Sequence, residues 1–408
     1  MHVIFLAPHF PPNQRRFVQG LKNVGARVTG VCDARPEHLD PEIKRLLDDY
    51  EYVGNITDDD AVTEAVRRIQ RRGPWVHKLE ATVEAHVLTA ARVRERTAIP
   101  GLPLAVAERC RDKFLMKQFL TEQGFPCARQ AAVSTGAEAR AALQTVGVPL
   151  VLKPRAGAGA AATYRIDSAA DLERAIAETG LDQRARPFTM EAFLSGHEGF
   201  YDTLTINGQV AFEGICHYYP NVLEAMRTRE VAARIVVTNR LDAPGYAELR
   251  QLGRRVITAL GVTTSATHME WFFGPEGLKF SEIGARPPGV HLWDIYCAAN
   301  EFDLYTEWAR AVCWGVMEAQ PSRRFAGGLL SIRPDRDGVV RGYTGAEEIQ
   351  RRYGDNIIAA HLPPVGSRTQ PIEAGYRANA WLYLRHPDYD GCKAMMDDIE
   401  ATLKMYAG

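Results

Sequence analysis

The segment from residue 268 to residue 286 constrains the fold most, because its pattern predicts a β-hairpin with acidic residues on both strands. It reads HMEWFF, then GPEG, then LKFSEIGAR. If residues 274–278 close the turn, Glu270 lies opposite Glu282 with Cβ atoms about 5 Å apart, where like charges repel. A four-residue loop would instead shift the register and separate the two faces. A divalent cation would reverse the repulsion, and carboxylates commonly hold Mg²⁺ beside phosphate oxygens. The alternative is a hairpin with solvent-facing charges.

Strand alternation places further side chains beside these acids. His268 shares the face of Glu270, and Arg286 shares the face of Glu282. A guanidinium in that position could bind a substrate carboxylate or a developing oxyanion. In the simpler alternative, Arg286 only pairs with a glutamate.

Two lysines and a loop of small residues indicate phosphate binding. Lys153 ends an apolar strand, and the sequence RAGAGAAAT, which includes Gly157 and Gly159, follows it. Small residues let backbone N–H groups approach phosphate oxygens, and a lysine adds a point charge. The Gly-Lys-Ser/Thr ending of a Walker A loop is absent. Lys113 opens a helix, where a surface lysine is the default interpretation, and Lys153 could equally extend to the surface from the edge of a hairpin.

The stretch MEAFLSGHE, residues 190–198, begins as an apolar strand and ends at a turn. An adenine needs an apolar slot with backbone donors and acceptors, and a ribose needs a carboxylate or hydroxyl partner. This segment could supply both, or it could be an ordinary strand that ends in polar residues.

The remaining pattern predicts several domains of mixed class. A β-α-β opening spans residues 3–32 without GxGxxG, which disfavours an NAD-dependent oxidoreductase. Helices are expected over 80–96 and 108–122, and Asn207-Gly208 predicts a hairpin. A domain boundary is expected after residue 103, and the chain beyond Pro321 reads as mostly β with a helix near 392–405.

Composition excludes some partners. The chain has 408 residues with a formal net charge of -1, so no global field attracts nucleic acid or an anionic membrane. Seven scattered cysteines without CxxC indicate neither a disulfide framework nor a zinc knuckle, and a reducing, cytoplasmic setting is expected. The apolar run at the N-terminus is too short for a signal peptide, and no apolar stretch reaches the roughly 20 residues of a membrane helix.

Taken in order, these motifs resemble the ATP-grasp superfamily over nearly the whole chain. The resemblance rests on the segments RVRERTAIPGLPLAVAERCRDKFLMKQFLTEQGFP, LVLKPRAGAGAAAT, MEAFLSGHE and HMEWFF…LKFSEIGARPPG. The resemblance implies an α/β and α+β fold. It comprises a Rossmann-like pre-ATP-grasp domain (1–105), a small nucleotide-binding lid (106–187), a central catalytic subdomain (188–320) and a β-rich C-terminal subdomain (321–408).

The resemblance also implies roles for single residues. Lys113 and Lys153 would contact ATP phosphates under a loop, containing Gly157 and Gly159, that closes to exclude water. Glu191 and the backbone of Phe193 and Leu194 would frame adenine, and Glu198 would hold ribose. Glu270 and Glu282 would bind Mg²⁺ (or Mn²⁺), and Arg286 would bind the carboxylate donor and steady the acyl phosphate. Catalysis would rest on Arg286 and Glu282, and His268, Arg286 and His217 are candidate substrate residues.

Two features differ from the family's usual pattern. Gly284 stands where many members carry a metal-binding asparagine, and alanines replace serines in the phosphate loop. The EIGARPPG form is closest to carboxylate–amine ligases, which implies amide formation between a carboxylate and an amine, such as two amino acids, with release of ADP and phosphate. The alternatives are a biotin- or bicarbonate-dependent carboxylase of the same superfamily and a non-catalytic ATP-binding regulatory protein. By analogy, the chain could be a homodimer.

Overall fold

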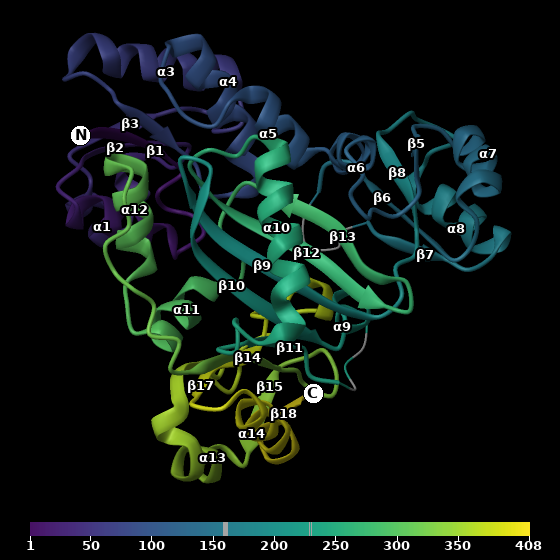
Figure 1. Ribbon diagram of the computed structural model, residues 1–408. Helices are drawn as coiled ribbons and strands as arrows, with labels where there is room; N and C mark the ends of the chain where they lie inside the picture. The colour runs from purple at the N-terminus through teal and green to yellow at the C-terminus, as the bar shows by residue number, and fades with distance from the viewer. Residues whose placement is uncertain (158–161, 228, 230) are drawn as a thin grey trace.

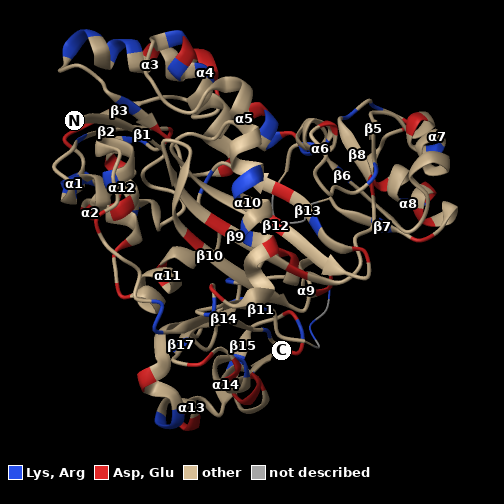
Figure 2. Ribbon diagram, viewed as in Figure 1, with Lys and Arg blue, Asp and Glu red and all other residues tan. Residues whose placement is uncertain are grey.

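The computed structural model describes residues 1–157, 162–227, 229 and 231–408, and over these residues the strands form four sheets (Figure 1). The N-terminal sheet is parallel, and the pairings in the other sheets are antiparallel. Lys and Arg as well as Asp and Glu are spread over the whole fold, in keeping with the balanced net charge (Figure 2). The mixed α/β and α+β class expected from the sequence is confirmed.

The N-terminal part is an open parallel sheet with the order β3-β2-β1-β4. Its strands are β1 (His2–Leu6), β2 (Arg27–Cys32), β3 (Asp49–Tyr52) and β4 (Lys78–Glu80). The helical elements are α1 (Gln14–Asn23), η1 (Pro36–His38), α2 (Pro41–Leu46), α3 (Asp59–Arg72), η2 (Glu84–His86) and α4 (Val87–Thr97). The side chains of β1 are buried throughout, as expected for a strand covered on both faces.

The small sheet that follows has the order β5-β8-β6-β7 and carries two helices on one side. It consists of β5 (Gln130–Val133), β6 (Leu150–Pro154), β7 (Tyr164–Ile166), β8 (Phe188–Ala192), α7 (Gly136–Val146) and α8 (Ala169–Thr179). Helices α5 (Leu104–Arg111) and α6 (Lys113–Glu122) connect it to the rest of the chain. We call β5–β8 with α6–α8 the lid.

The largest sheet has the order β13-β12-β9-β10-β11-β14-β17-β16. Its strands are β9 (His197–Ile206), β10 (Gln209–Tyr219), β11 (Arg234–Val237), β12 (Ser265–Gly274), β13 (Gly277–Gly284), β14 (Ala326–Ile332), β16 (Ile357–His361) and β17 (Ala380–His386). The predicted Asn207-Gly208 hairpin joins β9 to β10. The division at residues 105, 187 and 320 stays a prediction, but strands from both sides of residue 320 belong to this one sheet.

Helices and short elements cover this sheet and its far end. They are α9 (Val222–Ala225), η3 (Pro244–Tyr246), α10 (Ala247–Leu260), α11 (Leu292–Asn300), α12 (Leu304–Trp314), α13 (Ala346–Tyr353), η4 (Gly354–Asn356), η5 (Ile372–Ala374) and α14 (Tyr389–Thr402). Strands β15 (Val340–Thr344) and β18 (Lys404–Ala407) pair separately. Within the described residues, no helix combines the length and apolar character needed to cross a bilayer.

The N-terminal part is fixed to the large sheet through α1 and α12. The ring of Phe17 packs edge-on against Tyr305 and Trp308, at centroid distances of 4.8 and 5.1 Å. At Gly20 the two helices approach so closely that a Cβ atom would lie 2.5 Å from the carbonyl oxygen of Tyr305. Their contact is part of the largest hydrophobic core, so the N-terminal part has a defined position beside the central sheet.

Two helix predictions were wrong at their boundaries. The stretch expected as one helix over 108–122 is divided between α5 and α6, because the Asp112 side chain accepts hydrogen bonds from the backbone N–H groups of Phe114 and Leu115 and starts a new helix. The helix expected over 80–96 begins only at Val87, and residues 84–86 form the separate turn η2.

Candidate active site

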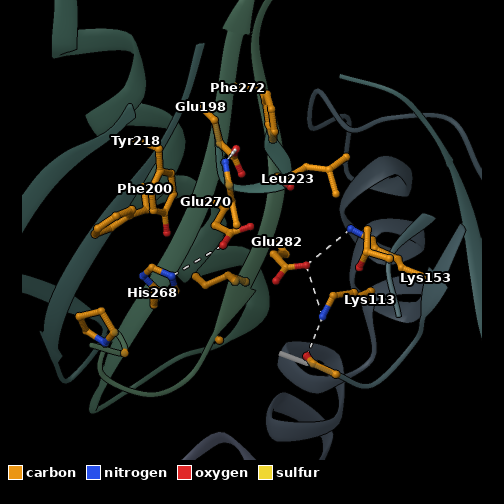
Figure 3. Close-up of a pocket in the computed structure, with 18 of the residues that line it drawn as sticks. Lys113, Lys153, Glu198, Phe200, Tyr218, Leu223, His268, Glu270, Phe272 and Glu282 are labelled. Carbon is orange, nitrogen blue, oxygen red and sulfur yellow. Dashed lines mark hydrogen bonds and ion pairs between the residues drawn. The ribbon is translucent and has the colours of Figure 1, made fainter. Parts of the chain in front are cut away.

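A cavity of about 390 Å³ lies between the lid and the face of the central sheet that carries the paired acids. Lysines come from the lid side and carboxylates from β9, β12 and β13 (Figure 3). Most of the residues singled out in the sequence line it: Lys113, Lys153, Gly157, Glu191, Phe193, Leu194, Glu198, His268, Glu270, Glu282 and Arg286. Gly159 belongs to residues 158–161, which lie outside the described residues.

The hairpin places Glu270 directly opposite Glu282, as predicted, although not through the predicted five-residue loop. Gly274 already pairs with Gly277, so the turn is two residues long. A β-bulge between Glu270 and Trp271 adds one residue, Ser281, to β13 and shifts the register back. The bulge therefore produces the facing carboxylates that the turn alone would have separated.

Three carboxylates on this sheet repel one another. Burial, together with the charges of Glu282 and Glu198, raises the pKa of Glu270 to about 7. Burial and Glu282 also raise the pKa of Glu198 to about 7, although its Oε2 accepts a hydrogen bond of 2.7 Å from the backbone N–H of Val222. A group of oxygen donors whose charges are poorly balanced fits a divalent cation, which would bring the compensating charge.

Glu282 differs from its neighbours because lysines surround it. Its Oε2 lies 3.3 Å from Lys113 Nζ and 3.6 Å from Lys153 Nζ (Figure 3). Burial opposes its ionisation, but the charges of Lys113, Lys153 and Lys117 outweigh burial and hold its pKa well below the usual range. Lys113 also donates to the carbonyl oxygen of Gly157 at 2.9 Å, which ties the start of α6 to the phosphate loop.

Glu191 joins two lysines inside the lid. One of its oxygens lies 2.9 Å from Nζ of Lys117, and the other lies 3.0 Å from Nζ of Lys153. Lys117 is fully buried, and burial lowers its pKa below the usual range. The carboxylate of Glu191 is thus engaged by two cations, whereas the neighbouring residues Phe193 and Leu194 remain as cavity lining.

Arg286 meets an acid from another part of the chain. Its Nε donates to Oε2 of Glu84 at 2.6 Å, and Arg111 Nε lies 3.6 Å from the other oxygen of Glu84. Gly284 makes room for this carboxylate, because a Cβ atom there would lie 3.1 Å from Glu84 Oε2. Arg286 therefore pairs with a glutamate, but with one from η2 and not from the hairpin.

His268 is held by a buried chain of hydrogen bonds. Its Nδ1 lies 2.7 Å from Asp202 Oδ1, and the hydroxyl of Tyr296 donates to Asp202 Oδ2 at 2.6 Å. The other ring nitrogen, Nε2, lies 3.9 Å from Glu270 Oε1 and faces the cavity (Figure 3). Asp202 thus fixes the ring so that Nε2 is directed to the paired acids.

His217 does not line the cavity, contrary to its selection as a substrate residue. Its ring nitrogens lie 2.8 Å from His197 Nε2 and 2.8 Å from the hydroxyl of Tyr246. Adjacent residues of a strand point to opposite faces, so on β10 it is the next residue, Tyr218, that reaches the cavity.

One end of the cavity is apolar. Its walls are side chains from β9, β10, β11 and the segments that flank α11 and η5, namely Phe200, Tyr218, Ile235, Val290, Leu292 and Tyr376. The hydroxyl of Tyr376 is buried and has no hydrogen-bond partner among the described residues. This end can hold an apolar group, while the lysines and carboxylates occupy the polar end.

Two residues of the site were missed at the level of sequence. Lys117 lies one helical turn after Lys113 on a helix with buried Met116 and Leu120, and this spacing could have marked it as buried. Glu84 is separated from Arg286 by 202 positions, and nothing in its local sequence marks it.

Comparisons with known proteins agree with this geometry. A family model described as the ATP-grasp domain matches residues 118–302. The L-arginine-specific L-amino acid ligase of Bacillus subtilis is 28% identical over 312 residues, which are 74% of this chain and 73% of that protein. The alanine–anticapsin ligase of Bacillus subtilis (strain 168) is 26% identical over 212 residues, 46% of this chain and 43% of that protein.

The crystal structure of an L-amino acid ligase from Bacillus licheniformis superposes with a TM-score of 0.79 at 18% identity, covering 100% of this chain and 98% of that chain. That likeness supports the fold, and the sequence relatives support the reaction class. Residues 118–302 are an ATP-grasp domain, and the chain is a carbon–nitrogen ligase similar to the carboxylate–amine ligases that share this domain.

Proposed function

We propose that this ligase joins two amino acids, activating the carboxylate of one as an acyl phosphate and passing it to the amine of the other. The observation that carries the proposal is the convergence of Glu270 and Glu282 with Lys113 and Lys153 in one cavity that also holds Arg286. Phosphoryl transfer needs positioning and charge stabilisation more than covalent chemistry by the protein, and these groups supply both.

In the first step, the donor carboxylate attacks the γ-phosphorus of ATP, the bond from that phosphorus to the β,γ-bridging oxygen breaks, and ADP leaves. Lys113 and Lys153 bind phosphate oxygens with their ammonium groups, and Glu191 keeps Lys153 directed into the cavity. The apolar lining and backbone near Phe193 and Leu194 receive adenine, and Glu198 holds the ribose. Mg²⁺ or Mn²⁺, bound by Glu270 and Glu282, would offset negative charge on the phosphates.

In the second step, the amine attacks the acyl carbon, a tetrahedral oxyanion forms, and phosphate leaves. Arg286 stabilises this oxyanion through its guanidinium, which is why it is assigned a catalytic role with Glu282. Glu84 contacts Arg286, so an incoming donor carboxylate competes with Glu84 for the guanidinium. The loop that contains Gly157 closes over the phosphates and protects the acyl phosphate from water.

The positions of the substrate side chains follow from the polar and apolar ends of the cavity. A carboxylate donor places its reacting group between Arg286 and Glu282 and its side chain toward the apolar end near Phe200 and Tyr376. His268, whose Nε2 faces this region, contacts the substrate. These positions favour a donor with an apolar or aromatic side chain over a charged one.

The proposal is tested by incubating the protein with ATP, Mg²⁺ and pairs of amino acids, with ADP release and the mass of the products as readouts. ADP together with a dipeptide supports it, and a Glu282→Gln variant controls for contaminating ligase. ADP release that depends on bicarbonate would favour the carboxylase alternative. ATP binding without ADP formation with any acid and amine would favour a regulatory protein.

Two further expectations belong to the proposal. A reducing, cytoplasmic setting accords with the seven cysteines, which all lie within the described residues and are free thiols. A homodimer, expected by analogy, would be tested by light scattering at several protein concentrations.

A further inference from the structure

A second group of ligating side chains lies at the carboxyl edge of the N-terminal parallel sheet. His9 follows β1, Cys32 ends β2, Asp33 comes directly after it, and His86 follows β4. These three strands are adjacent in the order β2-β1-β4, and the chain direction across the sheet changes at β1. Crevices at such switch points, outside the carboxyl ends of the strands, are where open α/β sheets bind ligands.

The three residues from β1 and β2 are already close together. Nδ1 of His9 lies 2.7 Å from Cys32 Sγ, and its Nε2 lies 4.0 Å from Asp33 Oδ1. One ligand atom from each residue lies within 4.8 Å of the others. The backbone N–H of Ala34 donates to Cys32 Sγ at 3.3 Å.

His86 provides the second observation. Its side chain is buried, with 8% of the residue exposed, and its Nδ1 has no hydrogen-bond partner among the described residues. A buried imidazole nitrogen without a partner carries a desolvation cost that a ligand would remove. His86 ends the turn η2, which follows β4, the strand paired with β1, so it lies toward the same edge of the sheet, outside the group of atoms within 4.8 Å of one another.

We propose that His9, Cys32 and Asp33 bind a zinc-class divalent cation and that His86 moves in to supply the fourth ligand. One thiolate, two imidazoles and one carboxylate make four ligands, the number and types that Zn²⁺ takes in tetrahedral sites. Binding exchanges the thiol proton of Cys32, which leaves to solvent, for the metal–sulfur bond.

This site differs in chemistry from the paired glutamates. Sulfur and imidazole donors select transition metals, whereas Mg²⁺ prefers oxygen ligands. The proposal does not rest on the ligase reaction, because none of its ligands lines the cavity. Since His86 and Glu84 share the turn η2, a bound cation would also fix the segment that reaches Arg286.

Cobalt provides a spectroscopic test, because a cysteine ligand to Co²⁺ gives a thiolate-to-metal charge-transfer band in the near ultraviolet. The 408-residue protein, freed of metal by chelation, is titrated with Co²⁺ in excess Mg²⁺, which occupies oxygen sites. The expected result is one equivalent of Co²⁺ with this band and with intense tetrahedral visible bands, all displaced by one equivalent of Zn²⁺. The band is lost in Cys32→Ser, and His9→Gln and His86→Gln each weaken binding roughly tenfold or more.

Matched controls separate loss of a ligand from loss of structure. Cys313→Ser changes another buried thiol and His38→Gln another histidine of the same domain, and both keep the band. His9 is partly exposed, so His9→Gln preserves the fold and tests the site even if Cys32→Ser unfolds. A wild-type spectrum without a thiolate band at saturating Co²⁺, or a band that persists in Cys32→Ser, would overturn the proposal.

Discussion

Replacing Glu191 by glutamine is expected to destabilise the lid strongly, because it leaves Lys117 without its counter-charge. Lys117 is fully buried, and Glu191 is the acid that its ammonium group contacts, at 2.9 Å. Lys153 loses the same partner but still lies 3.6 Å from Glu282. Removing one member of a buried ion pair typically costs about 3–5 kcal/mol, since the remaining charge stays desolvated.

The protonation equilibrium of Lys117 limits this cost. A lysine with the ordinary pKa of 10.5 can lose its proton at pH 7 for about 1.36 kcal/mol per pH unit, or about 5 kcal/mol in total. If Lys117 loses its proton in the folded variant, its pKa in the folded state lies further below its pKa in the unfolded state. The unfolded chain then binds more protons, so the stability of the variant rises as the pH increases toward 10.5.

Hydrogen exchange followed by mass spectrometry on β6 and β8 measures this effect inside the lid. A loss of about 3–5 kcal/mol corresponds to exchange roughly 10²- to 5 × 10³-fold faster in Glu191→Gln. Lys117→Met removes the buried charge, and Glu191 still contacts Lys153 at 3.0 Å. The double variant, which combines Glu191→Gln with Lys117→Met, removes both members of the buried ion pair and leaves neither charge without a partner. The double variant is therefore expected to be more stable than Glu191→Gln alone. A double variant that is equally or less stable would refute the reasoning.

Three further outcomes follow from the site. Glu282→Gln is expected to abolish turnover and to weaken Mg²⁺-dependent nucleotide binding, measured by calorimetry, whereas Glu276→Gln on the exposed turn of the same hairpin leaves both unchanged. Arg286→Ala is expected to lower kcat for dipeptide formation by about 10²–10³-fold, and equal losses in ADP release and dipeptide would place its role in the first step instead. Because the pKa values of Glu198 and Glu270 are raised to about 7, a cation that lowers them should release protons. Mg²⁺ affinity should therefore rise from pH 6 to pH 8. Calorimetry in buffers of different ionisation enthalpy would show no such proton release if Glu270, beside Glu198, does not bind the cation.

The sequence predicted the chemistry of the hairpin better than its geometry. Alternation within each strand places His268, Glu270, Glu282 and Arg286 by local rules, and the facing of the two glutamates is confirmed. The bulge at Ser281 was not predictable, because serine in a strand carries no signal for an extra residue, and a turn of the wrong length happened to give the right register.

What the sequence could not provide depends on tertiary packing. A lysine is exposed by default, so the full burial of Lys117 appears only when Glu191 is brought beside it from 74 positions away. His217 was a candidate for the substrate pocket because it is an aromatic residue near the end of an expected strand, but which face of β10 meets the ligand depends on how the sheet is covered. Glu84 comes from a turn that had been expected to lie inside a helix.

Oxygen-isotope transfer tests the central claim most directly. An amino acid donor labelled with ¹⁸O in both carboxylate oxygens is incubated with ATP, Mg²⁺ and an acceptor amine, and the phosphate released is analysed by mass spectrometry. Attack of the carboxylate on the γ-phosphorus predicts one ¹⁸O atom in each phosphate formed with the dipeptide, in the wild type but not in Glu282→Gln. Dipeptide formed with unlabelled phosphate would contradict the account.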